Sequence, residues 1–581
     1  MTSETLVSPG ALTRRYRPNR WDIIAIPLVI GVVMSFVLGA RQAIVPFEIG
    51  EQLPLSLDPA YLPQYALRST LRMLIALVAS LVFALTYATA AAKSRRLEQV
   101  LIPVLDVLQS VPVLGYISFT VTAFIALFPH SLVGVECAAI FAIFTSEAWN
   151  MAFSVHQSLR TVPFDLRDAS AVFGQTGWQR FWRLEVPFAM PGLIWNAMMS
   201  MSGAWFFVVA SEAISVGDKH ATLPGIGSYI SVAIQQKNLG AIGWAILAML
   251  VVIILYDQLL FRPLVAWADR FKFEDTPGQI VPKSWVFDLL RRARFLRLLF
   301  RPAGFALRRV RNLPLFGRYR PEAIVRVAAH SAPRVITDVI WYAALAGVAA
   351  CVASRLYFYL SPNVTMAELL RVFRFGLYTA LRVLFLIVLA SLIWVPIGIF
   401  IGLRPRVAAI AQPIAQFLAA FPANLLFPVA VILILKYSLD ANIFLLPLMI
   451  LGTQWYLLFN VIAGASAFPQ DLRDASQEFR VKGIMWWRKV ALPGIYPYIL
   501  TGAITASGGC WNASIVSELV KWGDNTVRID GVGAYIAQAT TDGDYVKITL
   551  GVGVMSLFVA LTNRIIWRPL YRMAERKLRL G

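Results

Sequence analysis

The feature that most constrains this chain is a series of long apolar runs, each long enough to cross a lipid bilayer as a helix. A membrane-spanning helix needs about 20 consecutive, mostly apolar residues. Such runs lie near residues 22–40, 70–92, 100–128, 133–155, 191–216 and 239–261, and again near 335–360, 377–402, 410–436, 441–463, 497–521 and 546–566. The composition agrees, because 58% of the 581 residues are hydrophobic and only 15% are charged. We therefore predict an all-α membrane protein with about 12 transmembrane helices.

Basic residues indicate how these helices are oriented. The chain has 53 Lys and Arg against 32 Asp and Glu, a net charge of +21. The basic residues gather in alternate loops: before the first run, at Lys93, Arg95 and Arg96, within 156–190, at Arg404 and Arg406, within 470–490, and after Arg564. Loops rich in Lys and Arg stay on the cytoplasmic side. We therefore expect both termini in the cytoplasm and loops 41–69, 218–238 and 522–545 outside, and we do not favour nucleic-acid binding.

The N-terminal run could be confused with a secretion signal. Arg14, Arg15, Arg17 and Arg20 precede an apolar run from about Ile23 to Ala40. The apolar core of a signal peptide is shorter and ends at a small-residue cleavage site. We therefore interpret this run as a retained first membrane helix.

The chain is internally duplicated. The segment DLRDAS begins at Asp165 and recurs at Asp471, an offset of 306 positions. The same offset pairs Trp205 with Trp511 and Glu212 with Glu518, whereas upstream an offset of 310 pairs Arg72 with Arg382. Because six predicted spans separate equivalent positions, both copies have the same orientation. We therefore predict two parallel halves of 6 helices around one central path.

A duplicated cytoplasmic loop carries the most specific pattern. It runs from Asp165 to Ile194 and from Asp471 to Leu500. Each copy has a charged helical segment, a glycine turn, an aromatic and basic segment, and a proline that begins the next span. A helix–turn–helix between two spans makes a compact knob that suits docking in a partner's groove.

This loop resembles the EAA or coupling loop of importer-type ABC transporter permeases. Asp168-Ala169-Ser170 and Asp474-Ala475-Ser476 occupy the E-A-A places of the family pattern. Gly174 occupies its glycine place, and Gly177 and Gly483 supply further turn glycines. The second copy departs from the pattern because Arg480 stands at the glycine place. Whether the two loops are functionally equivalent is therefore open.

The resemblance extends to a subgroup of this family. Gly203-Ala204-Trp205 through Ser211-Glu212, followed by Gly225-Ile226-Gly227 and matched by Gly531-Val532-Gly533, resembles the nitrate, sulfonate, taurine and bicarbonate permeases. The resemblance implies a small anionic or vitamin-like substrate, an extracytoplasmic solute-binding protein and a bacterial inner membrane. It also implies that a dimeric ATPase, with ATP and Mg on that partner, docks on the two loops.

The chain itself is not expected to be an enzyme. It has no GxxxxGK[ST] phosphate loop. The four His and three Cys form no metal-site or catalytic pattern, so we predict no catalytic residue and no metal. The alternative is an ion-gradient-driven secondary transporter, since parallel halves also occur in that class.

Paired polar residues within the spans are candidates for the translocation path or a gate. Glu212 and Glu518 act either at a gate or binding-protein contact, or as structural acceptors for a neighbouring helix or the Gly-rich loop. Arg72 and Arg382 either attract an anion or snorkel to the interface. Trp205 and Trp511 either line the path or pack. Glu136 and Glu147 have no acidic counterparts in the second half.

These patterns divide the chain into five segments. We predict a cytoplasmic tail (1–20), a first permease domain (21–265), a basic cytoplasmic linker (266–333), a second permease domain (334–570) and a C-terminal cytoplasmic tail (571–581). Arginines alternate with Leu and Phe in the linker, which is typical of an interfacial helix on anionic lipid. Binding of a regulatory ligand or partner is the second interpretation of this linker.

Overall fold

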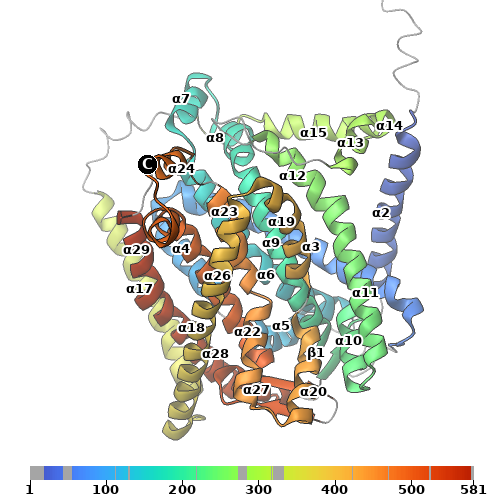
Figure 1. Ribbon diagram of the computed structural model, residues 1–581, viewed down its shortest axis with the longest axis vertical. Coiled ribbons are helices and arrows are strands. Elements are labelled where there is room, and N and C mark those ends of the chain that lie inside the picture. Colours follow the sequence, from blue (N-terminus) through green and yellow to red (C-terminus); the bar gives the residue numbers. More distant parts are fainter. Residues whose placement is uncertain are drawn as a thin grey trace, which may run out of the picture.

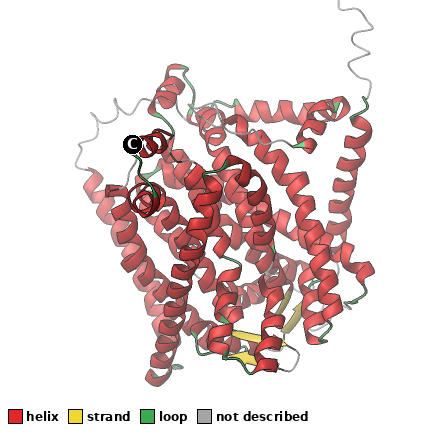
Figure 2. Cartoon of the chain, in the orientation of Figure 1, coloured by secondary structure: helices red, strands yellow, loops and turns green. Residues whose placement is uncertain are grey.

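The computed structural model describes residues 19–43, 55–110, 113–128, 131–216, 219–271, 284–315, 317, 333–421, 423–466, 468, 470–522 and 525–577. Parts of both predicted tails, of the predicted outer loop 41–69 and of the linker lie outside these residues. Helices dominate, and two short strand hairpins lie together near one end (Figure 2). The prediction of an all-α membrane protein is thus confirmed.

The first half consists of helices that alternate between the two ends of the molecule (Figure 1). Its elements are α2 (Asp22–Ala43), α3 (Leu62–Lys93), α4 (Arg95–Ser110), α5 (Val113–Leu127), α6 (Leu132–Thr161), α7 (Phe164–Val172), α8 (Gly177–Arg180), α9 (Val186–Glu212), β1 (Ala213–Val216), β2 (Lys219–Thr222), α10 (Ile226–Gln235), α11 (Leu239–Tyr256) and α12 (Arg262–Ala268). A π-helical turn, Phe181–Glu185, joins α8 to α9.

Three short linker helices follow, and then the second half repeats the order of the first. The linker helices are α13 (Trp285–Arg292), α14 (Arg294–Leu299) and α15 (Arg301–Arg311). The second half comprises α17 (Pro333–Leu360), α18 (Met366–Gly402), α19 (Pro405–Ala420), α20 (Phe427–Tyr437), α21 (Ala441–Phe444), α22 (Leu446–Leu451), α23 (Gln454–Ser466), α24 (Gln470–Glu478), α25 (Gly483–Trp486), α26 (Leu492–Ser517), β3 (Leu519–Trp522), β4 (Asn525–Arg528), α27 (Val532–Asp542), α28 (Tyr545–Thr562) and α29 (Arg568–Lys577).

Each predicted span corresponds to helical structure, but not every span is one long helix. Among the described residues, 8 helices are long and apolar enough to cross a membrane, or up to 9 if one bent pair is a single span. The predicted spans 100–128 and 410–436 are each divided, into α4 and α5 and into α19 and α20. Pro112 and Pro422 stand between the divided helices. Proline lacks an N–H and clashes with the preceding turn, so the sequence favours a helix end at these positions.

The predicted spans 191–216 and 497–521 extend too far at their C-terminal ends. Helix α9 ends at Glu212 and α26 at Ser517, and antiparallel hairpins follow. In the first hairpin Ala213 pairs with Thr222, and in the second Leu519 pairs with Arg528. In the sequence these apolar strand residues continue the apolar run of the helix, and a short apolar run does not distinguish a helix end from a strand.

The two halves interlock through the divided third spans. The hydrophobic core of the first half includes Leu425, Phe427 and Val431 from the second half. In the other direction, Thr122 of α5 hydrogen bonds to Tyr545 of α28 through their hydroxyls at 3.0 Å. Each half therefore completes its packing with helices of the other.

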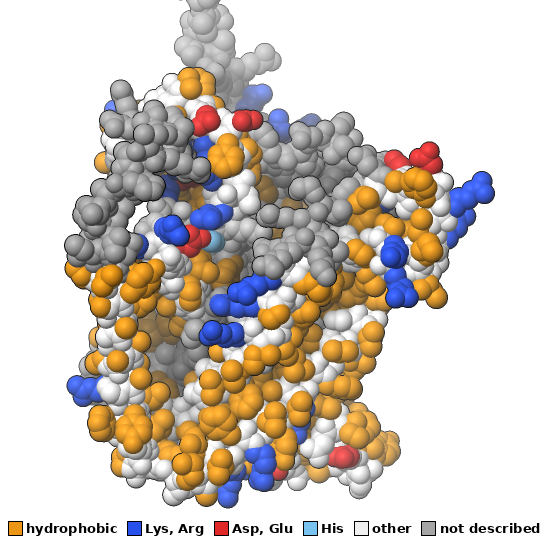
Figure 3. Space-filling model, turned by 90° about the vertical axis from the view of Figure 1, so that its left-hand side faces the viewer, with side chains coloured by type: hydrophobic (Ala, Val, Ile, Leu, Met, Phe, Trp, Pro, Cys, Tyr) orange, Lys and Arg blue, Asp and Glu red, His pale blue; other side chains and the backbone are white. Residues whose placement is uncertain are grey.

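The functional elements gather at opposite ends of the molecule. Helices α7, α8 and α24 lie at one end, which we call the loop end, and both hairpins with α10 and α27 lie at the other, the hairpin end (Figure 1). Hydrophobic side chains cover the surface between the ends, and most Lys and Arg side chains in that view lie toward them (Figure 3). An apolar belt between two polar ends is the surface of a membrane-spanning protein.

Candidate functional sites at the two ends

The first duplicated loop folds as a short helix, a left-handed turn and a second short helix. Helix α7 ends in a Schellman motif, in which Gln175 N–H donates to the Ser170 carbonyl (3.1 Å) and Gly174 N–H to the Ala171 carbonyl (2.9 Å). Gly174 has a φ of 63°, which glycine adopts without a Cβ penalty. Thr176 then caps α8 through a capping box with Gln179.

The second loop has the same backbone despite its different sequence. Val481 N–H donates to the Ser476 carbonyl (2.9 Å), and Arg480 N–H donates to the Gln477 carbonyl (3.0 Å). Arg480 itself has a φ of 50°, so it adopts the left-handed conformation of Gly174. The missing glycine therefore leaves the turn unchanged and adds local strain. Gly483, with a φ of 61°, lies at the start of α25.

The loop residues singled out from the sequence divide into buried and exposed groups. Ser170 and Ser476 are buried, Ala169 and Ala475 are partly buried, and Asp168 and Asp474 are exposed. Arg167 donates to the Leu159 carbonyl at 2.9 Å and so ties α7 to the end of α6. Each loop thus has an inner face that packs on its own half and an outer face that is free.

Large apolar side chains project from the outer faces of both loops. Exposed fractions are 71% for Phe164, 85% for Val172, 78% for Phe173, 79% for Phe479 and 77% for Ile484. These side chains lie on polar loops beyond the apolar belt rather than within it. Clustered exposed apolar residues of this kind mark a protein interaction surface.

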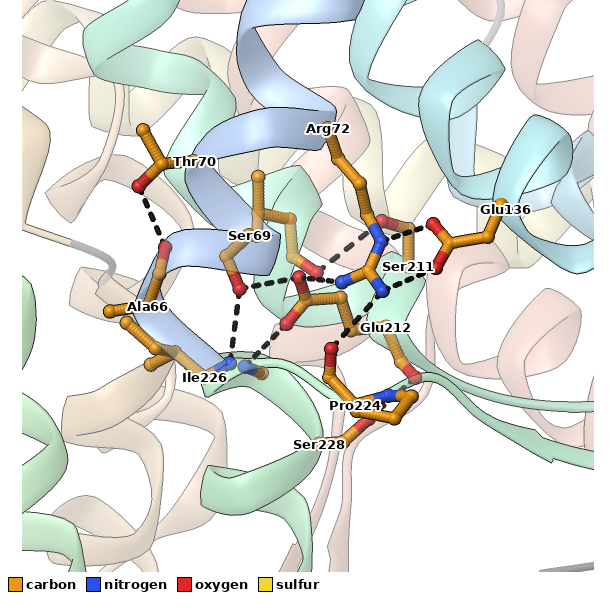
Figure 4. Close-up of polar contacts among 12 residues, drawn as sticks. Ala66, Ser69, Thr70, Arg72, Glu136, Ser211, Glu212, Pro224, Ile226 and Ser228 are labelled. Atoms are coloured by element: carbon orange, nitrogen blue, oxygen red, sulfur yellow. Dashed lines mark hydrogen bonds and ion pairs between the residues drawn. The ribbon is translucent and has the colours of Figure 1, made fainter. Parts of the chain in front are cut away.

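At the hairpin end of the first half, a buried arginine joins three elements (Figure 4). Arg72 on α3 is 3% exposed and donates to Glu212 Oε1 at 2.6 Å and to Glu136 Oε1 at 2.7 Å. Its guanidinium also reaches the Pro224 carbonyl at 3.1 Å. Ser69, one turn before Arg72, donates to Glu212 Oε1 at 2.6 Å. A guanidinium shared by two carboxylates satisfies charge that would otherwise be costly to bury.

The loop after the first hairpin packs its backbone against the cluster of Arg72, Glu212 and Ser69. Gly227 N–H donates to Glu212 Oε2 at 2.7 Å, and Ile226 N–H donates to Ser69 Oγ at 3.0 Å. A Cβ on Gly225 would overlap the Glu212 carboxylate, and one on Gly227 would lie 2.7 Å from the Val209 Cα. The Gly-Ile-Gly motif is therefore needed because the backbone passes directly over the buried glutamate.

The second half repeats this cluster with one charge fewer. Thr379 Oγ1 donates to Glu518 Oε1 at 2.8 Å, and Arg382 donates to the same oxygen at 3.1 Å and to the Asp530 carbonyl at 2.7 Å. Asn442 stands at the position of Glu136 and accepts from Arg382 at 3.5 Å. The first cluster is thus held by two carboxylates and the second by one.

Two buried tyrosines attach the same loops to the start of each half. The Tyr229 hydroxyl donates to the Leu57 carbonyl at 2.9 Å, and the Tyr535 hydroxyl donates to Glu368 Oε1 at 2.9 Å. Burial raises the pKa of both phenols above the ordinary value, so both stay protonated and donate.

The structure sorts the predicted path residues. Glu212 and Glu518 have the hydrogen bonds to neighbouring helices and Gly-rich loops that their structural interpretation expects. Arg72 does not snorkel, since it is buried between carboxylates. Trp205 and Trp511 are fully buried in the cores of their halves rather than open to a path. Sequence reasoning missed Ser69 and Thr379, although both precede the paired arginines by three positions.

Comparison with known proteins places these features in context. A family model described as the binding-protein-dependent transport system inner membrane component matches the chain twice, over residues 76–262 and 394–580. Over 187 residues, 31% of this chain and 64% of the relative, the chain is 29% identical to the bicarbonate transport system permease protein CmpB of Synechococcus elongatus.

Two other relatives are named for different substrates. Over 177 residues, 30% of this chain and 61% of the relative, the chain is 24% identical to the nitrate import permease protein NrtB of Synechocystis sp.. Over 170 residues, 29% of this chain and 54% of the relative, it is 29% identical to the glycine betaine/carnitine transport permease protein GbuB of Listeria monocytogenes. The chain spans less than two-thirds of the length of each of these relatives.

Proposed function

This chain belongs to the family of binding-protein-dependent transport system inner membrane components, with two permease domains in one chain, and from that premise we propose that it forms the translocation path of an ATP-driven importer. In this proposal the two halves, 21–265 and 334–570, enclose the path. A separate dimeric ATPase docks on the two loops at the loop end, which faces the cytoplasm together with both termini. A solute-binding protein delivers substrate at the hairpin end.

The exposed apolar outer faces of the two loops are the observation that carries this proposal. They have the same backbone, project at the same end of the molecule and present Phe173 and Phe479 at equivalent positions. A dimeric partner has two equivalent grooves, and two equivalent knobs match them. Closing of the ATPase dimer on ATP would then move one half relative to the other.

ATP and Mg belong to the partner in this scheme. The chain has no phosphate-binding loop in its sequence, and within the described residues no group of three or more His, Cys, Asp or Glu is arranged to hold a metal ion. The permeases that this chain resembles are transport components. We therefore assign binding and movement of the solute to this chain, as for the transport components of its family, and hydrolysis to the partner.

The substrate is proposed to be a small anion of the bicarbonate, nitrate, sulfonate or taurine class. The support is that two relatives are a bicarbonate and a nitrate permease. Arg72 contributes nothing to this argument, because its charge is already neutralised by Glu136 and Glu212. Uptake of labelled bicarbonate and nitrate into vesicles containing the whole complex tests the substrate class.

The coupling proposal is tested by ATPase capture. The full chain is expressed in its host, and the double variant F173D/F479D is compared with F305D. Phe305 is 60% exposed and lies in the middle of α15, outside both loops although the C-terminal end of α15 contacts the first one, so it is a matched control. We expect F173D/F479D to reduce the amount of co-purified ATPase by about tenfold or more, because exposed aromatic side chains are typical hot spots.

Two results would count against coupling through the loops. One is an equal loss of ATPase from F305D. The other is a chain that purifies without an ATPase and moves solute on an ion gradient, as a secondary transporter does.

A further inference from the structure

The linker helices α13, α14 and α15 form an arm that lies across the loop end of the first half (Figure 1). One end of this linker arm is fixed to α2. Asp22 Oδ1 accepts from Phe295 N–H at 2.9 Å and so caps α14, and Leu289 and Leu296 are buried against Ala25. The arm is thus a packed part of the fold.

The other end of the linker arm is bonded to the first loop. Trp178 Nε1 donates to the Val310 carbonyl (2.8 Å), and Gln179 Nε2 donates to the Asn312 carbonyl (2.9 Å). Arg183 donates to Asn312 Oδ1 at 2.8 Å. These bonds involve α8 and the π-helical turn, so any movement of the first loop must carry the arm or break them.

A cavity of about 430 Å³ lies where the linker arm, α9 and the end of α12 meet. Its lining includes three arginines and three aromatic side chains: Arg183, Arg270, Arg311, Trp182, Phe188 and Phe271. Arg183 comes from the π-helical turn, Arg270 from the segment after α12, and Arg311 from the last residue of α15. Three separate elements therefore direct cationic side chains to one place.

Among the described residues, no acidic side chain lines this cavity. Within the described ranges, no carboxylate lies at ion-pair distance from any of the three guanidinium groups. Arg270 stacks over the Phe287 ring at 4.9 Å, and Arg183 donates to the neutral Asn312. Converging arginines without acidic partners create a positive potential that favours a multivalent anion. Guanidinium groups match phosphate oxygens in geometry.

The position of the cavity along the membrane normal indicates where that anion could come from. It lies between the loop-end termini of two candidate spans, Gly177–Glu212 and Leu239–Phe271. Lipid headgroups occupy this level, and aromatic side chains are enriched there. The apolar part of the lining suits the glycerol and first methylenes of a lipid, while its mouth also admits a free phosphate.

We propose that this cavity is a binding site for a phosphate-bearing anion, which holds the linker arm against the first loop. Binding requires nothing from the proposed transport function, but its consequence rests on that function: a bound anion would restrain one of two coupling loops. Among the described residues, the second loop has no contact with the linker arm comparable to that of Trp178. Regulation would therefore act on one side of the molecule.

The test measures binding on the full chain. Wild type, R270Q/R311Q and R308Q/R309Q are placed in nanodiscs of phosphatidylcholine with or without phosphatidylglycerol, and retained lipid is counted by native mass spectrometry. A second arm titrates inorganic phosphate in nanodiscs of phosphatidylcholine alone and follows protection of Trp182 from fluorescence quenching. The control variant removes two arginines from α15 outside the cavity.

We expect R270Q/R311Q to weaken binding by about tenfold or more, since it removes two of the three guanidinium groups that line the cavity, and we expect R308Q/R309Q to leave it unchanged. Retention of phosphatidylglycerol identifies a lipid headgroup, whereas protection by inorganic phosphate alone identifies a soluble anion. The proposal is overturned if neither probe binds, or if both variants lose binding equally. The variant R270K/R311K, which keeps the charge, shows whether a loss comes from misfolding. If a probe binds the cavity but the amount of co-purified ATPase does not change, the binding site stands and only the proposed regulation fails.

Discussion

Arg72 lies between two carboxylates that come from different helices. Much of the stability of the hairpin end therefore depends on this one side chain. It links α3 to α6 through Glu136 and to α9 through Glu212, all at low exposure. Removing one partner from a buried pair leaves an uncompensated charge, which usually costs about 3–5 kcal/mol. The equivalent Arg382 is 15% exposed, so water can replace part of what Glu518 provides.

We therefore expect R72M to destabilise the protein much more than R382M does. The loss from R72M should be about 3–5 kcal/mol, because two buried carboxylates are left unpaired, and that from R382M about 1–3 kcal/mol. Thermal unfolding of the purified chain in detergent measures both. Equal losses would mean that Glu136 adds nothing to the first cluster.

Glu147, in the middle of α6, is a buried carboxylate that is not paired with Arg72 as Glu136 and Glu212 are. It is fully buried, and among the described residues neither of its carboxylate oxygens has a hydrogen-bond partner. The neighbouring Ser80 donates instead to the Phe144 carbonyl, at 3.3 Å. A buried carboxylate without partners is costly either as an unpaired charge or as an acid that must stay protonated.

Replacing Glu147 by glutamine removes the cost of burying a charge or of holding a proton there, although the amide stays without partners, so E147Q should raise the melting temperature by a few degrees. The control is E185Q, which breaks ion pairs to Lys93 (3.0 Å) and Arg180 (2.7 Å) and should lower it. If E147Q is as damaging as E185Q, then Glu147 has a partner in the working protein. Its position in α6 would make a transported cation or a proton the candidate.

At the scale of single elements, the duplicated loops show what sequence patterns can and cannot predict. The helix before the turn and the break at Gly174 follow from the charged segment and the glycine. The proline does not begin a new helix, because the helix that starts at Gly177 continues through a π-helical turn to Glu212. The left-handed turn at Arg480 does not follow, because arginine adopts this conformation only where surrounding hydrogen bonds enforce it. The hairpins after Glu212 and Ser517 were also missed, because their apolar residues continue the preceding run.

The candidate site was predictable only where both copies agree. The offset identified Arg72, Arg382, Glu212 and Glu518 as pairs, and each pair proved to lie in a cluster. It did not reveal which arginine meets which carboxylate. Glu136 has no acidic counterpart, since Asn442 stands at the equivalent position, yet both side chains contact the equivalent arginine. Contacts between helices depend on packing, which a pattern along one chain does not contain.

The strained turn of the second loop leads to a prediction about that element. R480G should stabilise the protein by about 1 kcal/mol, because glycine adopts a positive φ without steric cost. G174A, which removes the glycine at the equivalent position of the first loop, should lower the free energy of unfolding by a similar amount. The control G304A lies in helix α15 with open space around its Cβ and should be neutral or slightly stabilising. Thermal unfolding separates the three, and a destabilising R480G would show that the Arg480 side chain makes a contact worth more than the strain.

At the scale of the whole molecule, the two halves are two similar folds that are not independent. The divided third spans pack across the boundary, so Phe427 and Val431 complete the core of the first half, and Tyr545 meets α5. The fused chain fixes the two halves in equal number, and among the described residues its linker arm is bonded to the first loop. Fusion therefore allows the two sides to differ, as the clusters at Glu136 and Asn442 already do.

Interlocking makes the behaviour of a divided chain predictable. Cutting the gene within 318–332 yields a first fragment that lacks α19 and α20 and would expose part of its own core. We expect either fragment alone to aggregate or be degraded, because several large apolar side chains would lose their partners at about 25 cal/mol per Å² of exposed area. Co-expressed fragments should assemble and co-purify, since the cross-boundary contacts need no covalent link. Size-exclusion chromatography and pull-down on a tag carried by one fragment measure both outcomes.

A first fragment that is monodisperse alone, with the melting temperature of the full chain, would show that the halves fold independently and that the exchange of third spans contributes little stability. The double variant F427A/V431A in the co-expressed pair gives the quantitative test: it should weaken assembly without altering either coupling loop, because both side chains lie in the shared core.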